Sequence, residues 1–589
     1  PMNEAAHTTA GSPEAQRPPG AREMTLRSIV VAMLVAAVIG GSYPYIVLKL
    51  GFGPNISVVS AFFGYLALGI AFKNYNRWEN NIVQTAGTSA GQTAFLCVIM
   101  AAFDMLRMDP TTGFTFVLQP YQAFLWLTTA GVLGVLLSVP MRQHFVVDEK
   151  LTFADGVAAA ETLIVLDSRG PESKSAARMM AVGGFMSAIG FALREDARLI
   201  KAAWYRIPEM LAFGVNGPKM NVGMSWSLLS IGSGMLVGLR VSTSMLIGCV
   251  IGWVVFPPWL LQQGWVAHMV RREMLLWIMW PATGVLVAGG LTALVLRWRV
   301  LVKTFTSLSM SSVSGGDFPM KWVIWGSLAS AAALVGVQMM LGMSPWLTIT
   351  AIVLSIPLML VGIRVLGETN WGPISTLSNM MQGIFGVIAP GALLPNIVSV
   401  GVTGSVASAS EGLMQDFKTG HMIGSTPRFL TYAQLMAVPV GAAAVSWIYP
   451  LLRDTYGIGG EHGLQSPISQ RFAGFGIILS KGLSALPHGA VQALLIGTAI
   501  GIALTVLEGG KLKRFVPSAA GLGIGMLVPG SAVIAMFAGA AIAEMWRLVA
   551  RKQQETYVTP LASGFIAGEA VVAVLIPILV ALKVVTLQE

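Results

Sequence analysis

Carboxylate and amide side chains occur in this sequence inside long apolar stretches, where hydrocarbon could not satisfy them. Glu368, Asn379 and Asp416 all lie between Gly367 and Arg428, and apolar runs flank this stretch on both sides. In a membrane, such groups must face other protein groups or a water-filled path. We therefore expect residues 367–428 to form one wall of a substrate pathway.

Acidic residues in such surroundings could couple transport to protons. Burial raises the pKa of a carboxyl group, so the group can take up a proton near neutral pH and lose it when water arrives. The proton-coupling candidates are Glu79, Asp155, Glu368, Asp416 and Glu569, and Glu161 and Glu411 belong to the same wider set.

Each of these carboxylates also has a structural interpretation. Glu79 and Glu368 could stabilise helix N-termini. Asp416 lies two residues from Lys418, so the pair could form a structural ion pair or belong to a cytoplasmic loop. Glu569 could be a satisfied carboxylate between two helices. The sequence leaves these alternatives open.

Neutral polar residues near the same carboxylates could bind a substrate reversibly. The substrate-binding candidates are Asn81, Gln84, Thr85, Ser89, Gln92, Asn370, Ser375, Asn379 and Gln382, together with Glu368. Such groups suit peptide backbones or the carboxylates of a chelate. The competing role is helix–helix association, in which each interhelical hydrogen bond contributes about 1 kcal/mol.

The elements that carry these residues are predicted to be transmembrane helices. Of the 589 residues, 54% are hydrophobic and only 11% are charged, against about 25% charged in soluble domains. Runs of roughly 20 apolar residues recur along the chain, which indicates an all-α, polytopic membrane protein whose main partner is the lipid bilayer.

The net charge of +10 fits loops beside lipid headgroups, and we expect no nucleic-acid partner. Two cysteines in apolar runs imply no disulfide framework and no zinc site. We expect no metal site and no cofactor.

The polar stretches divide the chain. Residues 1–27 are rich in Pro, Gly and charge, and we expect a disordered tail. Its arginines precede the first apolar run and favour a cytoplasmic N-terminus. We expect an N-terminal transmembrane half at 28–300, a connecting loop at 301–320 and a C-terminal transmembrane half at 321–589.

Short sequence matches suggest that the two halves are duplicates. The segment 232–237 recurs at 523–528, and Met245 and Gly248 match Met536 and Gly539 at the same spacing of 291. Pro281 matches Pro560 at a spacing of 279, and Glu79 with Asn81 matches Glu368 with Asn370 at 289. Internal duplication is common in secondary transporters, with the substrate site between the repeats.

Several of these motifs together resemble the oligopeptide transporter (OPT) family, and in particular its bacterial branch. The resemblance is carried by four segments: Glu79-Asn-Asn-Ile-Val-Gln-Thr85, Gly367-Glu-Thr with Pro373, Gln415-Asp-Phe-Lys-Thr-Gly420, and Gly564-Phe-Ile-Ala-Gly-Glu569. The sequence departs from the family pattern at Gln92, Asn370 and Asn379, where bacterial relatives often carry charged residues.

The resemblance implies about sixteen transmembrane helices in two duplicated halves, with re-entrant or broken helices. It further implies secondary active uptake of short oligopeptides or peptide-like molecules, usually driven by protons, or uptake of metal chelates and siderophores as in the yellow stripe-like branch. A bacterial inner membrane is also implied by the resemblance.

Other function classes fit less well. The sequence has no G-x-x-x-x-G-K-[ST] phosphate loop and no soluble domain large enough for a nucleotide, which argues against a primary pump. A passive channel is a weaker alternative to alternating access, because duplicated halves with broken polar segments fit a transporter better. We expect no enzymatic activity, and the sequence leaves homo-oligomerisation open.

Overall fold

The computed structural model describes residues 20–50, 56–65, 67–68, 76–108, 112–167, 171–194, 208, 210–214, 217–269, 271–296, 318–370, 372–458, 464, 466–480, 487–509 and 516–581. The expected tail at 1–27 lies outside these residues up to position 19, and the expected connecting loop lies outside them up to position 317.

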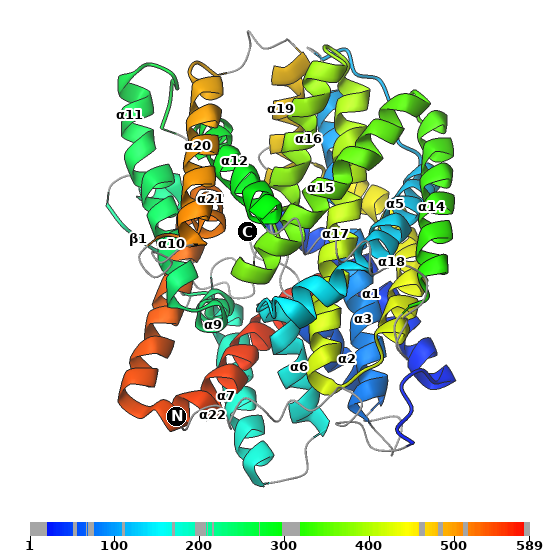
Figure 1. The fold of residues 1–589 in the computed structure, drawn as a ribbon, viewed down its shortest axis with the longest axis vertical. Coiled ribbons are helices and arrows are strands. Elements are labelled where there is room, and N and C mark those ends of the chain that lie inside the picture. The colour runs from blue at the N-terminus through cyan, green and yellow to red at the C-terminus, as the bar shows by residue number, and fades with distance from the viewer. Residues whose placement is uncertain are drawn as a thin grey trace.

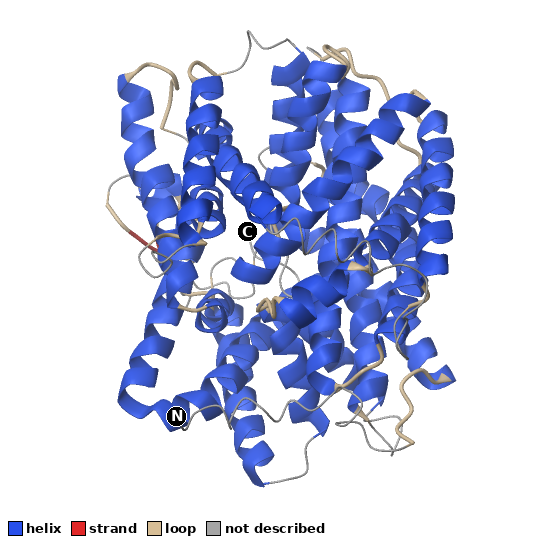
Figure 2. Ribbon diagram, in the orientation of Figure 1, coloured by secondary structure: helices blue, strands red, loops and turns tan. Residues whose placement is uncertain are grey.

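Nearly every described element is a helix (Figures 1 and 2). The first half contains α1 (Leu26–Leu50), α2 (Ile56–Tyr65), α3 (Arg77–Ala94), α4 (Cys97–Met108), α5 (Pro120–Ser138), the π-helical segment η3 (Gln143–Asp148), α6 (Ala154–Asp167), α7 (Pro171–Leu193), β1 (Met210–Ala212), α8 (Gly217–Met220), β2 (Gly223–Ser225), α9 (Leu228–Val237), α10 (Leu239–Val250), the π-helical segment η6 (Ile251–Val255), α11 (Phe256–Gln262) and α12 (Arg271–Leu296). The second half contains α14 (Met320–Met340), α15 (Pro345–Thr369), α16 (Ile374–Ile388), α17 (Leu393–Ile423), α18 (Pro427–Tyr456), α19 (Pro467–Ser480), α20 (Ala490–Glu508), α21 (Ala519–Leu527) and α22 (Gly530–Ala581). The two short strands pair antiparallel, with Met210 opposite Ser225.

The helices confirm an all-α, multi-pass membrane protein. Within the described residues, 11 helical stretches are long and apolar enough to cross a bilayer. Four further apolar helices of 10–17 residues, among them α9 and α16, are shorter than a span. The total of sixteen spans stays a prediction.

Several helices are interrupted, as expected for a transporter. The span 77–108 breaks into α3 and α4 at Phe95 and Leu96. Helix α15 ends at Asn370, whose backbone is left-handed with φ of 57°. Helix α22 bends at Ala550, where φ is −144° and ψ is 66°. These breaks give polar side chains room inside the helix bundle.

The two halves of the sequence are interleaved in space. Helices α1 and α3–α6 pack with α14 and α17–α19, whereas α7, α9, α10 and α12 pack with α20–α22. The first group lies on the right of Figure 1 and most of the second on the left. The two groups meet mainly along α12 and α22. The division at 301–320 therefore separates two parts of the sequence, but each packed group contains helices from both.

The second group contains a reciprocal interface at the spacing that relates Gly232 to Gly523. A Cβ atom on Gly234 of α9 would collide with the carbonyl oxygen of Met536, and one on Gly525 of α21 would collide with that of Met245. Ser227 and Ser518, which are related by the same spacing, each cap the helix that follows by accepting a backbone N–H. Two copies of one helix pair around a two-fold axis would make such contacts. They support the expected duplication, which stays a prediction.

Candidate functional site

Helix α3 is the most polar helix of the bundle interior. Its sequence, RWENNIVQTAGTSAGQTA, is rich in amide and hydroxyl side chains, yet all of its residues except Arg77 and Gln92 are buried. It packs against α1, α2, α17 and α18. Polar groups that are buried in this way need partners from these helices.

Asp416 of α17 is the centre of this polar layer. Its side chain has no exposed surface, and it accepts two hydrogen bonds from amides on two other helices. Gln84 Nε2 of α3 donates to Oδ1 at 2.6 Å, and Gln434 Nε2 of α18 donates to Oδ2 at 2.6 Å. Among the described residues, no cation lies within ion-pair distance of Asp416.

Lys418 does not neutralise Asp416. The two residues lie on the continuous helix α17, where positions two apart do not face each other. The Lys418 Nζ instead donates to the carbonyl oxygen of Leu151 at 2.9 Å. The structural ion pair and the cytoplasmic loop, both left open by the sequence, are therefore wrong for Asp416.

Unpartnered polar atoms occur on the two amides that bind Asp416 and elsewhere on α3. The Oε1 atoms of Gln84 and Gln434 and the Oγ1 of Thr85 are buried without a hydrogen-bond partner. Each such atom costs about 1–3 kcal/mol if nothing satisfies it. Water or substrate would satisfy these atoms, so the layer is suited to a polar ligand.

The other candidates on α3 join helices of the same bundle. Asn81 Nδ2 donates to Ser425 Oγ at 2.9 Å, and Ser89 Oγ donates to the carbonyl oxygen of Gln434 at 3.4 Å. Gln92 Oε1 accepts from Ser408 Oγ at 2.8 Å. These contacts fit the helix–helix role as well as they fit substrate binding.

Glu411 is a second buried carboxylate on α17, with only 2% of its surface exposed. Its Oε1 has no hydrogen-bond partner. The carboxylate lies against Gly362 and Gly372, where a Cβ atom would collide with it. Two glycines therefore make room for this group beside the polar layer.

A polar junction connects the start of α6, the end of α15 and α17. Asn370 Nδ2 donates to Asp155 Oδ1 at 2.6 Å, and Asn370 Oδ1 accepts from the Asp155 backbone N–H at 2.8 Å. Gln415 Oε1 accepts from the backbone N–H of Gly156 at 2.7 Å. These side chains satisfy the first N–H groups of α6, so Asp155 and Asn370 have a positioning role here.

Three predicted proton sites are paired with arginine. Glu79 lies in the first turn of α3, where it accepts from Arg27 Nε at 3.0 Å and Thr25 Oγ1 at 2.5 Å. Glu569 accepts from Arg194 Nη1 at 2.7 Å and from Ser227 Oγ. Glu368 lies 3.0 Å from Arg364 Nη2.

Glu79 and Glu368 occupy opposite ends of their helices. Glu79 is in the first turn of α3, as the capping interpretation requires, and Glu368 is in the last turn of α15. A carboxylate at a helix C-terminus gains nothing from the helix dipole. The sequence match between Glu79 and Glu368 therefore does not connect equivalent helix positions.

The remaining candidates lie on α16, away from the bonds of Asp416. Gln382 Nε2 donates to Asn396 Oδ1 at 2.9 Å and to the carbonyl oxygen of Phe472. Asn379 Oδ1 and Gln382 Oε1 are buried without a partner, and Ser375 is half-buried. This amide cluster joins α16, α17 and α19.

Sequence reasoning missed Gln434 and Gln415 as site residues. Gln434 is the single amide in the apolar run 433–445 of α18, and a lone polar residue inside a span is itself a signal of function. Gln415 gave no separate signal in the sequence, because it lies beside Asp416. Among the described residues, no three His, Cys, Asp or Glu side chains form a group that could hold a metal ion.

Known proteins resemble this chain along its whole length. The model of the family "OPT oligopeptide transporter protein" matches residues 23–580. A putative oligopeptide transporter of Saccharomyces cerevisiae is 23% identical, covering 96% of this chain and 97% of the relative. The iron-phytosiderophore transporter yellow stripe 1 of Zea mays is 25% identical, covering 93% and 89%. A probable metal-nicotianamine transporter of Oryza sativa is 24% identical, covering 94% and 88%.

The family match covers every helix discussed above, including the polar layer around Asp416. The relatives named for what they carry are transporters, and the polytopic helical fold agrees with that activity. This chain is therefore a member of the oligopeptide transporter family.

Proposed function

We propose that this protein is a proton-coupled symporter that imports its substrate by alternating access. The observation that supports this proposal is the Asp416 carboxylate, which two neutral amides hold in the bundle interior. Protonating Asp416 would leave no unpaired cation behind. Protonating Glu79 or Glu569 would leave a partly or fully buried arginine without its partner, which is costly.

Gln84 offers a link between the proton and the substrate. Its Nε2 donates both to Asp416 and to Thr88 Oγ1 at 2.9 Å, while its Oε1 has no partner. A proton on Asp416 weakens this charge-assisted bond. Gln84 can then turn its amide towards a substrate, so that substrate binding and proton binding favour the same state.

Short oligopeptides or peptide-like molecules are the proposed substrates. Their backbones match the unpartnered amide and hydroxyl groups of α3 and α16. Metal chelates are a second candidate, because relatives from maize and rice are named for iron-phytosiderophore and metal-nicotianamine transport. A thermal-shift screen of the purified protein with tri- to pentapeptides and nickel-nicotianamine separates the two, since only a bound ligand raises the Tm.

We further propose that the N-terminus is cytoplasmic, in a bacterial inner membrane. Glu23 binds Thr426 at the start of α18, and Arg27 binds Glu79 at the start of α3. The starts of α1, α3 and α18 therefore share one membrane face. This face carries Arg22, Arg27, Arg77 and Arg428, as the positive-inside rule favours for the cytoplasm.

The coupling proposal is tested with Asp416→Asn in proteoliposomes that contain a pH-sensitive dye. We expect the wild type to carry protons inward when the ligand found by thermal shift is added, and the variant to carry none. Glu555→Gln is the matched control, because that carboxylate is exposed on α22. Proton influx through Asp416→Asn at the wild-type rate would remove Asp416 as the coupling group.

A further inference from the structure

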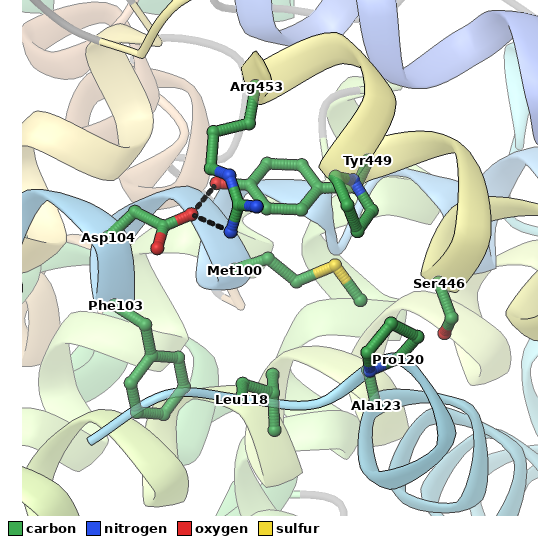
Figure 3. Close-up of a pocket in the computed structure, with 10 residues that line it drawn as sticks. Met100, Phe103, Asp104, Leu118, Pro120, Ala123, Ser446, Tyr449 and Arg453 are labelled. Atoms are coloured by element: carbon green, nitrogen blue, oxygen red, sulfur yellow. Dashed lines mark hydrogen bonds and ion pairs between the residues drawn. The ribbon is translucent and has the colours of Figure 1, made fainter.

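Two adjoining pockets lie between α4, α5, α17 and α18. The outer pocket is lined by Met100, Asp104, Ser446, Tyr449 and Arg453, among others (Figure 3). The inner pocket shares Met100, Leu118 and Ala123 with it and continues to Trp126 and Gly401. The outer pocket has a volume of about 20 Å³, which is room for one water. The inner pocket is smaller, at about 10 Å³. Together the two pockets mark the line of a narrow route that the proposal below opens.

Hydrogen-bond donors converge on one carboxylate at the mouth of this route. Tyr449 Oη donates to Asp104 Oδ2 at 2.7 Å. Arg453 Nη1 lies 3.6 Å from the same oxygen, and Arg107 Nη2 lies 3.0 Å from Oδ1. Figure 3 shows the Tyr449 and Arg453 side chains reaching Asp104 from α18, above the sulfur of Met100. Two guanidinium groups and a phenol are a typical set for binding a carboxylate.

Two further donors along the route have no partner. Ser446 Oγ lines the outer pocket and is buried without a hydrogen bond. Trp126 Nε1 lines the inner pocket and is likewise buried and unpartnered. A buried donor that finds no partner is destabilising unless a ligand or water uses it. Both donors are therefore available to a ligand or a water in these pockets.

The mouth lies on the membrane face opposite the N-terminus. Arg428 is at the start of α18, and Arg453 is near the end of the same helix. Asp104 and Arg107 are correspondingly near the end of the span that begins at Arg77. With a cytoplasmic N-terminus, the mouth faces outward, where an imported substrate arrives.

We propose that this mouth is an outer subsite for a carboxylate of the substrate, and that Asp104 closes it by occupying the place of that carboxylate. An arriving substrate carboxylate displaces Asp104 and takes over Arg453, Tyr449 and the Ser446 hydroxyl. Separation of α4 from α18 then opens the route towards Trp126. This inference rests on the proposed import function for its substrate, but the anion preference of the mouth does not depend on it.

The anion preference is tested by cysteine labelling. Met100→Cys is made in a background in which both native cysteines, Cys97 and Cys249, are replaced by alanine. The protein reacts with an anionic or a cationic methanethiosulfonate of similar size. We expect the anionic reagent to label the new thiol at position 100 faster, and Asp104→Asn to raise its rate by about tenfold, because the arginines are no longer held by an internal carboxylate.

Val98→Cys is the matched control. Val98 is also buried on α4 but lines neither pocket, so it should stay unlabelled in every background. Labelling at position 98 would show that Asp104→Asn only loosens the bundle. Equal or faster labelling of position 100 by the cationic reagent, or no acceleration by Asp104→Asn, would overturn the proposal.

The hydroxyl at the mouth gives a second test through transport. Ser446→Ala should raise the KM about fivefold, as expected from the loss of one hydrogen bond, with an unchanged maximal rate and no fall in Tm. An unchanged KM in an active Ser446→Ala transporter would contradict the subsite. A wild-type protein that transports none of the tested ligands would instead contradict the proposed function, whatever the labelling shows.

Discussion

Two regions of this molecule are both buried and both built from the two halves of the chain, but they differ in kind. The α9–α10 and α21–α22 interface is apolar and close-packed at glycines, and the contact of Gly234 recurs at Gly525. The layer of α3, α17 and α18 is polar and has no such repeat, because the same spacing places Leu125 in correspondence with Asp416.

The glycine interface holds helices together, whereas the polar layer provides the groups that could do chemistry. The glycine interface needs only shape, and the same kind of glycine contact occurs in both helix pairs. Under the proposed coupling, the polar layer needs a carboxylate that can gain a proton without leaving a buried charge. Asp416 of α17 meets this need, and amides from α3 and α18 bind it.

The first test of this comparison changes the stability of the protein at the glycines of the close-packed interface. Gly234→Ala should destabilise the protein by about 1–3 kcal/mol, because the new methyl group meets a backbone carbonyl that cannot move aside. Gly525→Ala should cost about as much, since a Cβ atom there would meet the backbone carbonyl of Met245 in the same way. The measurement is the Tm of the detergent-solubilised protein, followed by tryptophan fluorescence.

Gly336→Ala is the control for this pair. Gly336 of α14 has open space where a Cβ atom would lie, and alanine favours the helix. If Gly234→Ala lowers the Tm while Gly525→Ala leaves it unchanged, the two contacts are not equivalent and the reciprocal interface is contradicted.

An effect of similar size is expected at the junction beside the polar layer. Asn370→Ala should cost about 1–3 kcal/mol, because it removes the hydrogen bonds to Asp155 and places alanine in a left-handed conformation. Asn370→Gly separates the two causes, since glycine keeps the conformation and loses only the bonds. Chemical denaturation of both variants measures the difference. Equal stability of the wild type and Asn370→Ala would show that the junction does not hold α6 and α15 together.

The smallest effect is expected on the surface. Arg551 pairs with Glu555 on α22, and both side chains are more than half exposed. Arg551→Ala should change the stability by less than about 0.5 kcal/mol, because exposed ion pairs contribute little. A Tm shift as large as that of Gly234→Ala would contradict the expected difference in stability effect between surface and interior substitutions.

Much of the fold could be predicted from the sequence, because long apolar runs identify membrane-spanning helices. Apolar runs predict helices, and the spacing of Gly232 and Gly523 predicts that two helix pairs are alike. The interleaving of the halves could not be predicted, since apolar faces in a membrane do not specify which helix covers them.

The candidate site was predicted in part. Gln84 and Asp416 were both candidates, but the hydrogen bond between them depends on a packing that sequence spacing does not encode. The arginine partners of Glu79 and Glu569 could not be predicted from the sequence either. These partners make both carboxylates members of ion pairs. The sequence did not predict a role for Asp104. That role depends on contacts with Tyr449 and Arg453, which lie in the other half of the sequence.

The proposed role of Asp416 as the carrier of the coupling proton is tested by one comparison of uptake and exchange. Wild-type and Asp416→Asn proteoliposomes are compared in uphill uptake driven by an inward pH gradient and in exchange of labelled for unlabelled substrate at equal pH. We expect the wild type to do both and to lose accumulation when a protonophore is added. Asp416→Asn should exchange substrate but accumulate none. Uphill accumulation by Asp416→Asn at the wild-type level would contradict proton coupling through Asp416.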